Sequence, residues 1–292
     1  MDFYITVGVS IAVYAIAVMG TFILTGMNGL FSLGQAAFMG IGAYMSAILV
    51  VNYDVPFILA VVVSMGISAI LAYMVGYVTL RIRQDFFALA TFGFGQAVIS
   101  LMTELTGITG GAMGFSNIPR VTTPVIAVVS LIAVIFFIWG FRKSHWGKDS
   151  LAIRSNELAA QVAGINVFKH KLTIFILSAV LAAFAGALMA FHTRYVEPAM
   201  YGWITSVTWI IIVFFGGRDS LTGTVIGSLF LLAAPEILRF SSAWRILIYC
   251  VIILVIINIR PRGLFGTWEF SFDPLRKFLK RLFGQNKLQE EK

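Results

Sequence analysis

The sequence predicts an all-α polytopic membrane protein with about nine transmembrane segments, within a range of eight to ten. The first observation is composition, since 59% of the 292 residues are hydrophobic and only 12% are charged. A soluble domain carries about twice that charged fraction. The second observation is a mean hydropathy of +0.93. The third is a series of uncharged runs of about 20 residues, each long enough to cross a ~30 Å hydrocarbon core as a helix.

Hydropathy orders the predicted segments along the chain. The first has no Lys or Arg before it, and its apolar run exceeds the about 7–15 residues of a signal-peptide core. We therefore expect a permanent span there rather than a cleaved signal. The second segment is rich in glycine and the seventh is short, so either can be broken or re-entrant. The nine predicted spans are 4–24, 30–51, 56–80, 86–103, 121–141, 172–191, 203–217, 221–238 and 244–259.

The distribution of Lys and Arg predicts the orientation. With the N-terminus outside and the C-terminus in the cytoplasm, the 21 Lys and Arg residues fall on the inner side except Arg120, Arg194, Arg239 and Arg245. This asymmetry follows the positive-inside rule. We therefore expect a transmembrane domain at 1–269 that contains a cytoplasmic segment at 142–171. A basic cytoplasmic tail at 270–292 follows it.

Several classes of chemistry lack their usual sequence signals. The basic residues sit at the ends of apolar runs rather than in a basic stripe, so we expect no nucleic-acid partner. The lone Cys250 lies in an apolar run, and the three histidines fall in loops or at span ends. The only Gly-Lys pair, at Gly147, has Arg142 where a phosphate-binding loop needs its first glycine. We expect no catalytic residue, no metal site and no cofactor bound by this chain.

Acidic residues are scarce inside the predicted spans. Ion-coupled carriers use titratable side chains within the membrane, and here Glu236 is the deepest candidate, beside Arg239. It can pair with Arg239 at the membrane surface or bind a coupling ion. An ion-coupled secondary carrier therefore stays open as an alternative. A scaffold subunit that binds a cytoplasmic partner without transport stays open as well.

The predicted spans contain neutral polar side chains. Such groups can line a path for a small polar solute, or they can form hydrogen bonds between helices, which is the commoner role. The candidate path residues are Asn28, Ser32, Gln35, Thr91 and Gln96.

The charged segment 149–166, "DSLAIRSNELAAQVAGIN", stands between two hydrophobic runs. Leu151, Leu158, Val162 and Ile165 recur at spacings that place them on one face of a helix, and Gly164 is a suitable stop. The predicted amphipathic helix has about 15 residues, too few to span a bilayer. It is either a linker on the membrane surface or a docking element for a cytoplasmic partner.

Several motifs in this chain resemble those of a known family. The pattern Glu157-x-Ala159-Ala160-x-x-x-Gly164 resembles the cytoplasmic EAA-type loop of bacterial ABC importer permeases, with Leu158 inserted after the glutamate. Two departures are "GGRDS" at 216–220, where the family usually has Gly-Gly-Leu/Met-Gly-Ser, and Gln96, where an acidic residue often follows "GFG". The segments 28–44, 80–96, 109–114, 152–172 and 261–266 resemble, in order, those of LivM-type permeases of the branched-chain amino acid ABC transporters.

This resemblance implies a permease subunit of an ATP-driven importer in the bacterial inner membrane, in contact with lipid. It implies two cytoplasmic ABC ATPase subunits that use the ATP, a second related permease subunit and an extracytoplasmic solute-binding protein. The expected substrates are Leu, Ile and Val, with urea, short amides and other amino acids as alternatives. The residues that it assigns to ATPase coupling are Arg154, Glu157, Ala159, Ala160 and Gly164.

Overall fold

The computed structural model describes residues 2–82, 84–237, 263, 264 and 266. Within them every regular element is a helix, apart from one isolated antiparallel bridge between Phe115 and Val196. The elements are α1 (Asp2–Thr21), η1 (Phe22–Met27), α2 (Gln35–Tyr53), α3 (Phe57–Thr79), α4 (Gln84–Glu104), α5 (Thr106–Thr109), η2 (Gly111–Met113), α6 (Pro124–Lys143), α7 (His145–Ser155), α8 (Glu157–Val162), α9 (Val167–Thr193), η3 (Pro198–Tyr201), α10 (Trp203–Gly216) and α11 (Leu221–Ile237).

Seven helices of the described part are long and apolar enough to cross a membrane. The chain is therefore a polytopic helical membrane protein, and each of the first seven predicted spans corresponds to one of these helices. The eighth prediction, 221–238, is the shorter apolar helix α11, which contains Pro235. The ninth, 244–259, and the tail at 270–292 lie outside the described residues.

Two helix boundaries differ from the predicted ones. α2 begins at Gln35 rather than near residue 30, because residues 28–34 form an irregular connection. α9 begins at Val167 rather than near residue 172, since the side chain of Asn166 accepts a hydrogen bond from the backbone N–H of Lys169 at 3.1 Å. This cap starts the helix before the apolar run does.

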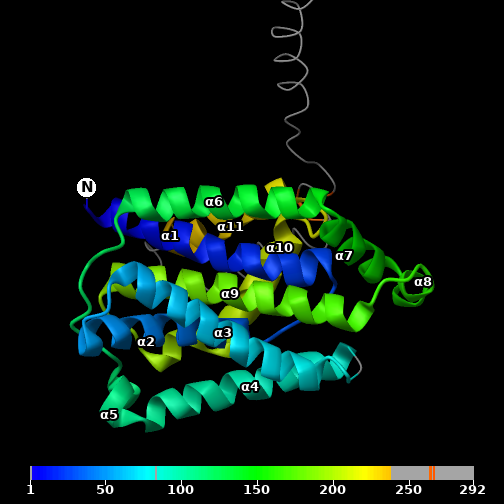
Figure 1. The fold of residues 1–292 in the computed structure, drawn as a ribbon. Coiled ribbons are helices and arrows are strands. Elements are labelled where there is room, and N and C mark those ends of the chain that lie inside the picture. Colours follow the sequence, from blue (N-terminus) through cyan, green and yellow to red (C-terminus); the bar gives the residue numbers. More distant parts are fainter. Residues whose placement is uncertain (1, 83, 238–262, 265, 267–292) are drawn as a thin grey trace, which may run out of the picture.

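The long helices run roughly parallel or antiparallel to one another, with the first residues of α1 and the short helix α5 at one end and α7 and α8 at the other (Figure 1). α9 packs against α1, α2 and α3, and most of its side chains are buried. Towards the outside of the bundle, α3 and α6 expose apolar side chains such as Ile58, Val125 and Phe136. These surfaces suit contact with lipid.

α2 and α9 cross within the core of the bundle, and their backbones are in direct contact there. A Cβ atom built on Gly42 would collide with the backbone of Ala183, and one built on Gly186 would collide with the carbonyl of Met39. Glycine at both positions lets the two backbones touch, as small residues do where membrane helices cross. The crossing positions α2, whose first residue, Gln35, is one of the candidate path residues.

The glycine-rich loop at 104–120 contains the two short helices α5 and η2. Its end is held against the segment after α9. The backbones of Phe115 and Val196 exchange hydrogen bonds of 2.7 and 3.0 Å, and the Tyr195 hydroxyl donates to the carbonyl of Met113 at 2.7 Å. The loop is therefore tied down at the end of the molecule opposite α8.

Candidate functional site

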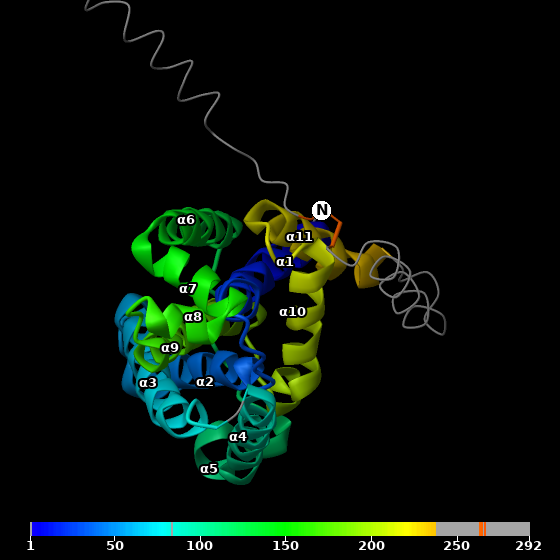
Figure 2. The same cartoon turned by 90° about the vertical axis from the view of Figure 1, so that its right-hand side faces the viewer.

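The segment 142–171 projects from one end of the bundle as a pair of helices, and Figure 2 looks onto that end. Ser144 begins α7 by accepting a hydrogen bond from the N–H of Gly147 at 3.4 Å. Asn156 begins α8 by accepting one from the N–H of Ala159 at 3.1 Å. Gly164, with a φ of +87°, terminates the pair in a conformation that other residues rarely adopt. The predicted stop at Gly164 is confirmed.

The predicted single amphipathic helix is wrong. Asn156 has extended backbone angles (φ −158°, ψ 108°) that interrupt the helix between α7 and α8, so the spacing across residue 156 no longer places side chains on one face. Leu158 and Val162, two of the four residues predicted to share one face, are 73% and 90% exposed. Ile165, which was predicted on the same face, packs inwards with Ile153, Ala160 and Val167.

The five residues predicted to contact an ATPase take different positions. Ala159 and Gly164 are exposed, whereas Ala160 lies on the buried face of α8. Glu157 accepts a hydrogen bond from the Lys171 ammonium group at 2.6 Å. Arg154 points towards the bundle, where its guanidinium group binds the carbonyl of Gly26 and the carboxylate of Asp219. Ala159 and Gly164 therefore lie on the surface, as do Leu158 and Val162.

The first span is interrupted near this end of the bundle. Its last turn, η1, is π-helical, and the chain then runs irregularly through residues 28–34 before α2 begins. Side chains from elsewhere hold the interruption in place. The N–H of Leu33 donates to the Thr91 hydroxyl at 3.1 Å, and the N–H of Ala36 donates to the Ser206 hydroxyl at 2.9 Å. Irregular backbone inside a membrane protein is tolerated where it is buried or lines a cavity, and π-helical turns often occur at functional sites.

Four of the five predicted path residues gather around this interruption. Asn28, Ser32, Gln35 and Thr91 are each at most 2% exposed, whereas Gln96 lies further along α4 and is partly exposed. Thr91 and Ser32 accept backbone hydrogen bonds that shape the loop. The amide groups of Asn28 and Gln35 have no hydrogen-bond partner among the residues that the structure describes. Buried polar groups without partners are costly, so these two side chains stay candidates for hydrogen bonds to a polar solute.

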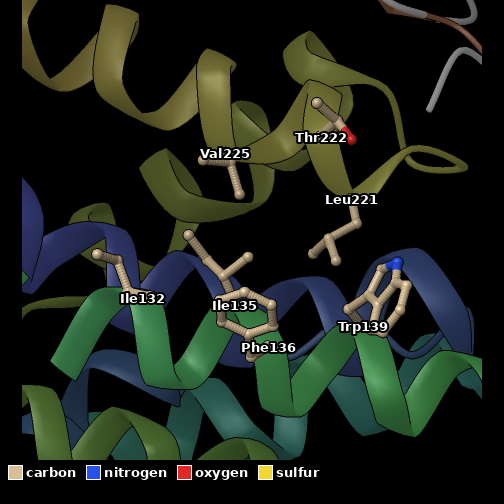
Figure 3. Close-up of a pocket in the computed structure, with 7 residues that line it drawn as sticks. All are labelled: Ile132, Ile135, Phe136, Trp139, Leu221, Thr222 and Val225. Atoms are coloured by element: carbon tan, nitrogen blue, oxygen red, sulfur yellow. The ribbon is translucent and has the colours of Figure 1, made fainter. Parts of the chain in front are cut away.

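A polar cavity of about 290 Å³ lies between the interruption and the helix pair. Its walls include Asn28 from the end of η1, Glu157 and Lys171 from the helix pair and α9, and Arg218 from the turn after α10. A second cavity of about 300 Å³ lies between α6 and α11 and is lined almost entirely by apolar side chains such as Ile135, Phe136 and Leu221 (Figure 3). Of these two cavities, the first offers the charges and most of the hydrogen-bonding groups that a polar solute needs.

Sequence reasoning missed Ser206 and Asp219. Nothing in the sequence distinguishes Ser206 from the other hydroxyl residues of the spans, because its contact with Ala36 crosses 170 residues of chain. Asp219 carried a signal, since it is the fourth residue of "GGRDS", one of the two departures from the family pattern. The ion pair with Arg154 gives this departure a structural role.

We predict that Gln35→Leu lowers solute uptake about 10-fold and leaves the melting temperature of the purified protein unchanged or higher. The reason is that leucine removes a buried amide whose missing hydrogen bonds cost about 1–3 kcal/mol, and with it a polar group of the path. Thr122→Val is the matched control. The Thr122 hydroxyl is also buried without a partner in the described part of the chain, but it lies just before α6 at the opposite end. Uptake by the control should equal that of the wild type. Full uptake by Gln35→Leu would contradict the path assignment.

Comparison with known proteins gives a consistent result. Residues 3–257 match the family model described as "Branched-chain amino acid transport system / permease component". The chain is 27% identical, over 286 residues, to the high-affinity branched-chain amino acid transport system permease protein LivM of Salmonella typhimurium and to that of Escherichia coli. These alignments cover 86% of this chain and 67% of each relative. The chain is also 24% identical over 233 residues to the fructose import permease protein FrcC of Rhizobium meliloti, covering 71% and 64%. No solved structure gives a significant match.

Proposed function

Because this chain belongs to the family of permease components of branched-chain amino acid transport systems, we propose that it is the membrane-spanning subunit of an ATP-driven amino acid importer. It is a multi-pass protein of the inner membrane. The match to two LivM permeases over most of the chain supports leucine, isoleucine and valine as substrates. The likeness to a fructose permease makes sugars the class against which this assignment must be tested.

The observation that carries the proposal is the exposed surface of α8. Leu158 and Val162 are 73% and 90% exposed, and they lie between two candidate spans rather than within one. The hydrocarbon that surrounds the spans therefore does not account for their exposure. Apolar side chains that project from a rigid element suit a protein partner. We propose that α7 and α8 dock into an ATPase subunit, with Leu158, Ala159, Val162 and Gly164 at the contact.

We also propose the orientation. Several basic residues lie at the end of the bundle that carries α7 and α8: Arg81 and Arg218 line cavities together with Glu157 of α8, Lys143 ends α6, and Lys148 lies in α7. Basic residues at one end of a membrane protein favour the cytoplasmic side for that end. Docking of α7 and α8 to a cytoplasmic ATPase requires the same orientation. The N-terminus is then outside. The proposed total of nine spans includes the residues beyond Ile237.

The proposed assembly contains two ATPase subunits, a second related permease and an extracytoplasmic binding protein, with ATP bound by the ATPases. This chain would do no chemistry of its own. The binding protein delivers the solute to the end with the 104–120 loop, and the solute passes the interruption at residues 28–34. The neutral amides of Asn28 and Gln35 can hydrogen-bond to the amino and carboxylate groups of an amino acid. Nucleotide drives the cycle only because it stabilises one conformation of the complex over the other.

The test is uptake of radiolabelled leucine by proteoliposomes that hold the complete complex and its binding protein. We expect uptake to stop when ATP inside the vesicles is depleted and to continue when ion gradients are collapsed. Excess isoleucine or valine should compete, whereas urea, acetamide and fructose should not. Glu236→Gln should retain uptake; the side chain of Glu236 lies outside the described part of the structure. Uptake that survives ATP depletion and fails with Glu236→Gln would instead identify an ion-coupled carrier.

A further inference from the structure

The side chain of Arg154 joins three parts of the chain that are far apart in sequence. From α7 its guanidinium group donates to the carbonyl of Gly26 in η1 and to the carboxylate of Asp219 in the turn before α11. It also lies 3.5 Å from the carbonyl of Arg218. The side chain of Arg154 is 17% exposed and that of Asp219 is 30% exposed, so water screens the pair less than at an open surface.

Gly26 belongs to the last turn before the interruption of the first span. The final carbonyls of a helix have no partner within the helix, and a cation at that end interacts favourably with the helix dipole. Arg154 provides both a donor and a positive charge at this position. The fit is close, because a Cβ atom on Gly29 would stand 2.9 Å from Cγ of Arg154, and Gly29 has a φ of +74°. The last turn of the first span is thus in direct contact with the Arg154 side chain of α7.

Asp219 is held from a second direction. Arg142, at the end of α6, donates to the backbone carbonyl of Asp219 at 2.9 Å. Ser220 caps the start of α11 by accepting a hydrogen bond from the N–H of Gly223 at 2.9 Å. We call Gly26, Arg142, Arg154 and Asp219 the Arg154 junction. It connects α7 to the end of the first span, to the end of α6 and to the turn between α10 and α11.

We propose that the Arg154 junction transmits the movement of the docked helix pair to the interruption at residues 28–34, and that Arg154 and Asp219 are positioning residues for transport. The proposal rests on the proposed function, in which an ATPase moves α7 and α8. The Arg154 junction is a separate link, because α8 itself contacts the rest of the chain through Ala160, which packs on Ile153 and Val167, and through the Glu157–Lys171 ion pair. Arginine suits the task since its planar group makes several hydrogen bonds in a fixed geometry.

The test uses the complete complex in proteoliposomes with the variants Arg154→Gln, Asp219→Asn and the double variant. Uptake, ATP hydrolysis and ATPase co-purification are measured for each. We expect co-purification and basal ATP hydrolysis to be retained, while the amount of leucine taken up per ATP hydrolysed falls about 10-fold, within the usual range of coupling between sites. Because the two residues act as a pair, the double variant should lose no more than either single variant.

Lys148→Gln is the matched control, since it removes a positive charge from an exposed position on the same helix. It should keep the wild-type ratio of uptake to ATP hydrolysed. Arg154→Lys keeps the positive charge but not the planar guanidinium group. Its ratio of leucine taken up to ATP hydrolysed should therefore lie between those of Arg154→Gln and the wild type. If the Arg154→Gln permease fails to assemble with its partner subunits, the Asp219→Asn variant alone tests the proposal. That variant keeps the contact between Arg154 and the Gly26 carbonyl, and it keeps the Asp219 carbonyl that Arg142 binds.

Two results would contradict the proposed role of the Arg154 junction. One is a wild-type ratio in Asp219→Asn, and the other is a double variant whose loss equals the product of the two single losses. Failure of the proposed function is distinguishable from these results, because the wild-type complex itself would then show no ATP-dependent uptake.

Discussion

Replacing both Leu158 and Val162 with aspartate is expected to abolish co-purification of the ATPase subunits and to reduce uptake at least about 100-fold. Exposed apolar side chains that become buried in a partner supply much of the affinity of an interface, and a buried unpaired carboxylate opposes binding. The chain itself should insert and fold normally, because side chains that are 73% and 90% exposed make few internal contacts. The measurement is recovery of the ATPases with an affinity-tagged permease from solubilised membranes.

Lys148→Asp provides the matched control for this experiment. It introduces the same carboxylate on α7, at an exposed position outside the proposed contact. The control should retain the ATPases. Substitution of Ala160 is less informative, since Ala160 is buried against Ile153 and Val167 and an aspartate there would disturb the helix pair itself. If the Leu158/Val162 double variant retained its ATPases, α8 would not be the docking element.

The second large effect is expected at the crossing of α2 and α9. Gly186→Val should cost about 3 kcal/mol or more of folding stability, at or above the upper end of typical overpacking costs. The reason is that the new side chain would collide with the backbone carbonyl of Met39, which no rotamer change can move away. The measurement is the midpoint of thermal aggregation of the fluorescently tagged protein in detergent, together with its yield in membranes.

Gly66→Val is the corresponding control. Gly66 lies in α3, and a Cβ atom there would have nothing within 4 Å among the described residues. The control should keep the wild-type midpoint. A Gly186→Val variant as stable as this control would show that α2 and α9 do not pack as closely as the structure indicates.

The features that could be predicted from the sequence are those that depend on local composition. Uncharged runs gave the first seven spans, because a helix in lipid must satisfy its backbone groups internally and cover itself with apolar side chains. The glycines near the start of the second predicted span indicated that it could be broken, and the break at residues 28–34 lies there. Asn28 and Gln35 were selected as polar groups within predicted spans, and they prove to be buried at that break.

The remaining features depend on contacts that no local pattern encodes. A single extended residue, Asn156, divides the predicted continuous helix into two shorter ones, and Leu158 and Val162 no longer share a face with Leu151. Arg154 looked like a surface residue of a charged segment, yet its partner Asp219 stands 65 residues away. The assignment of Ala159 and Gly164 to an ATPase contact stays a prediction, as does the role of Glu157.

The π-helical turn Phe22–Met27 also determines which way Asn28 faces. A π-helical turn is an α-helical turn with one residue too many, and in an α-helix one residue corresponds to a rotation of about 100°. If the extra residue were passed on into the irregular stretch that follows, the end of the first span would rotate by that angle while the residues before Phe22 kept their packing. Asn28 would turn away from the cavity without any tilt of the helix. The extra residue of this π-helical turn therefore sets the helical register in which the first span presents Asn28 to the cavity.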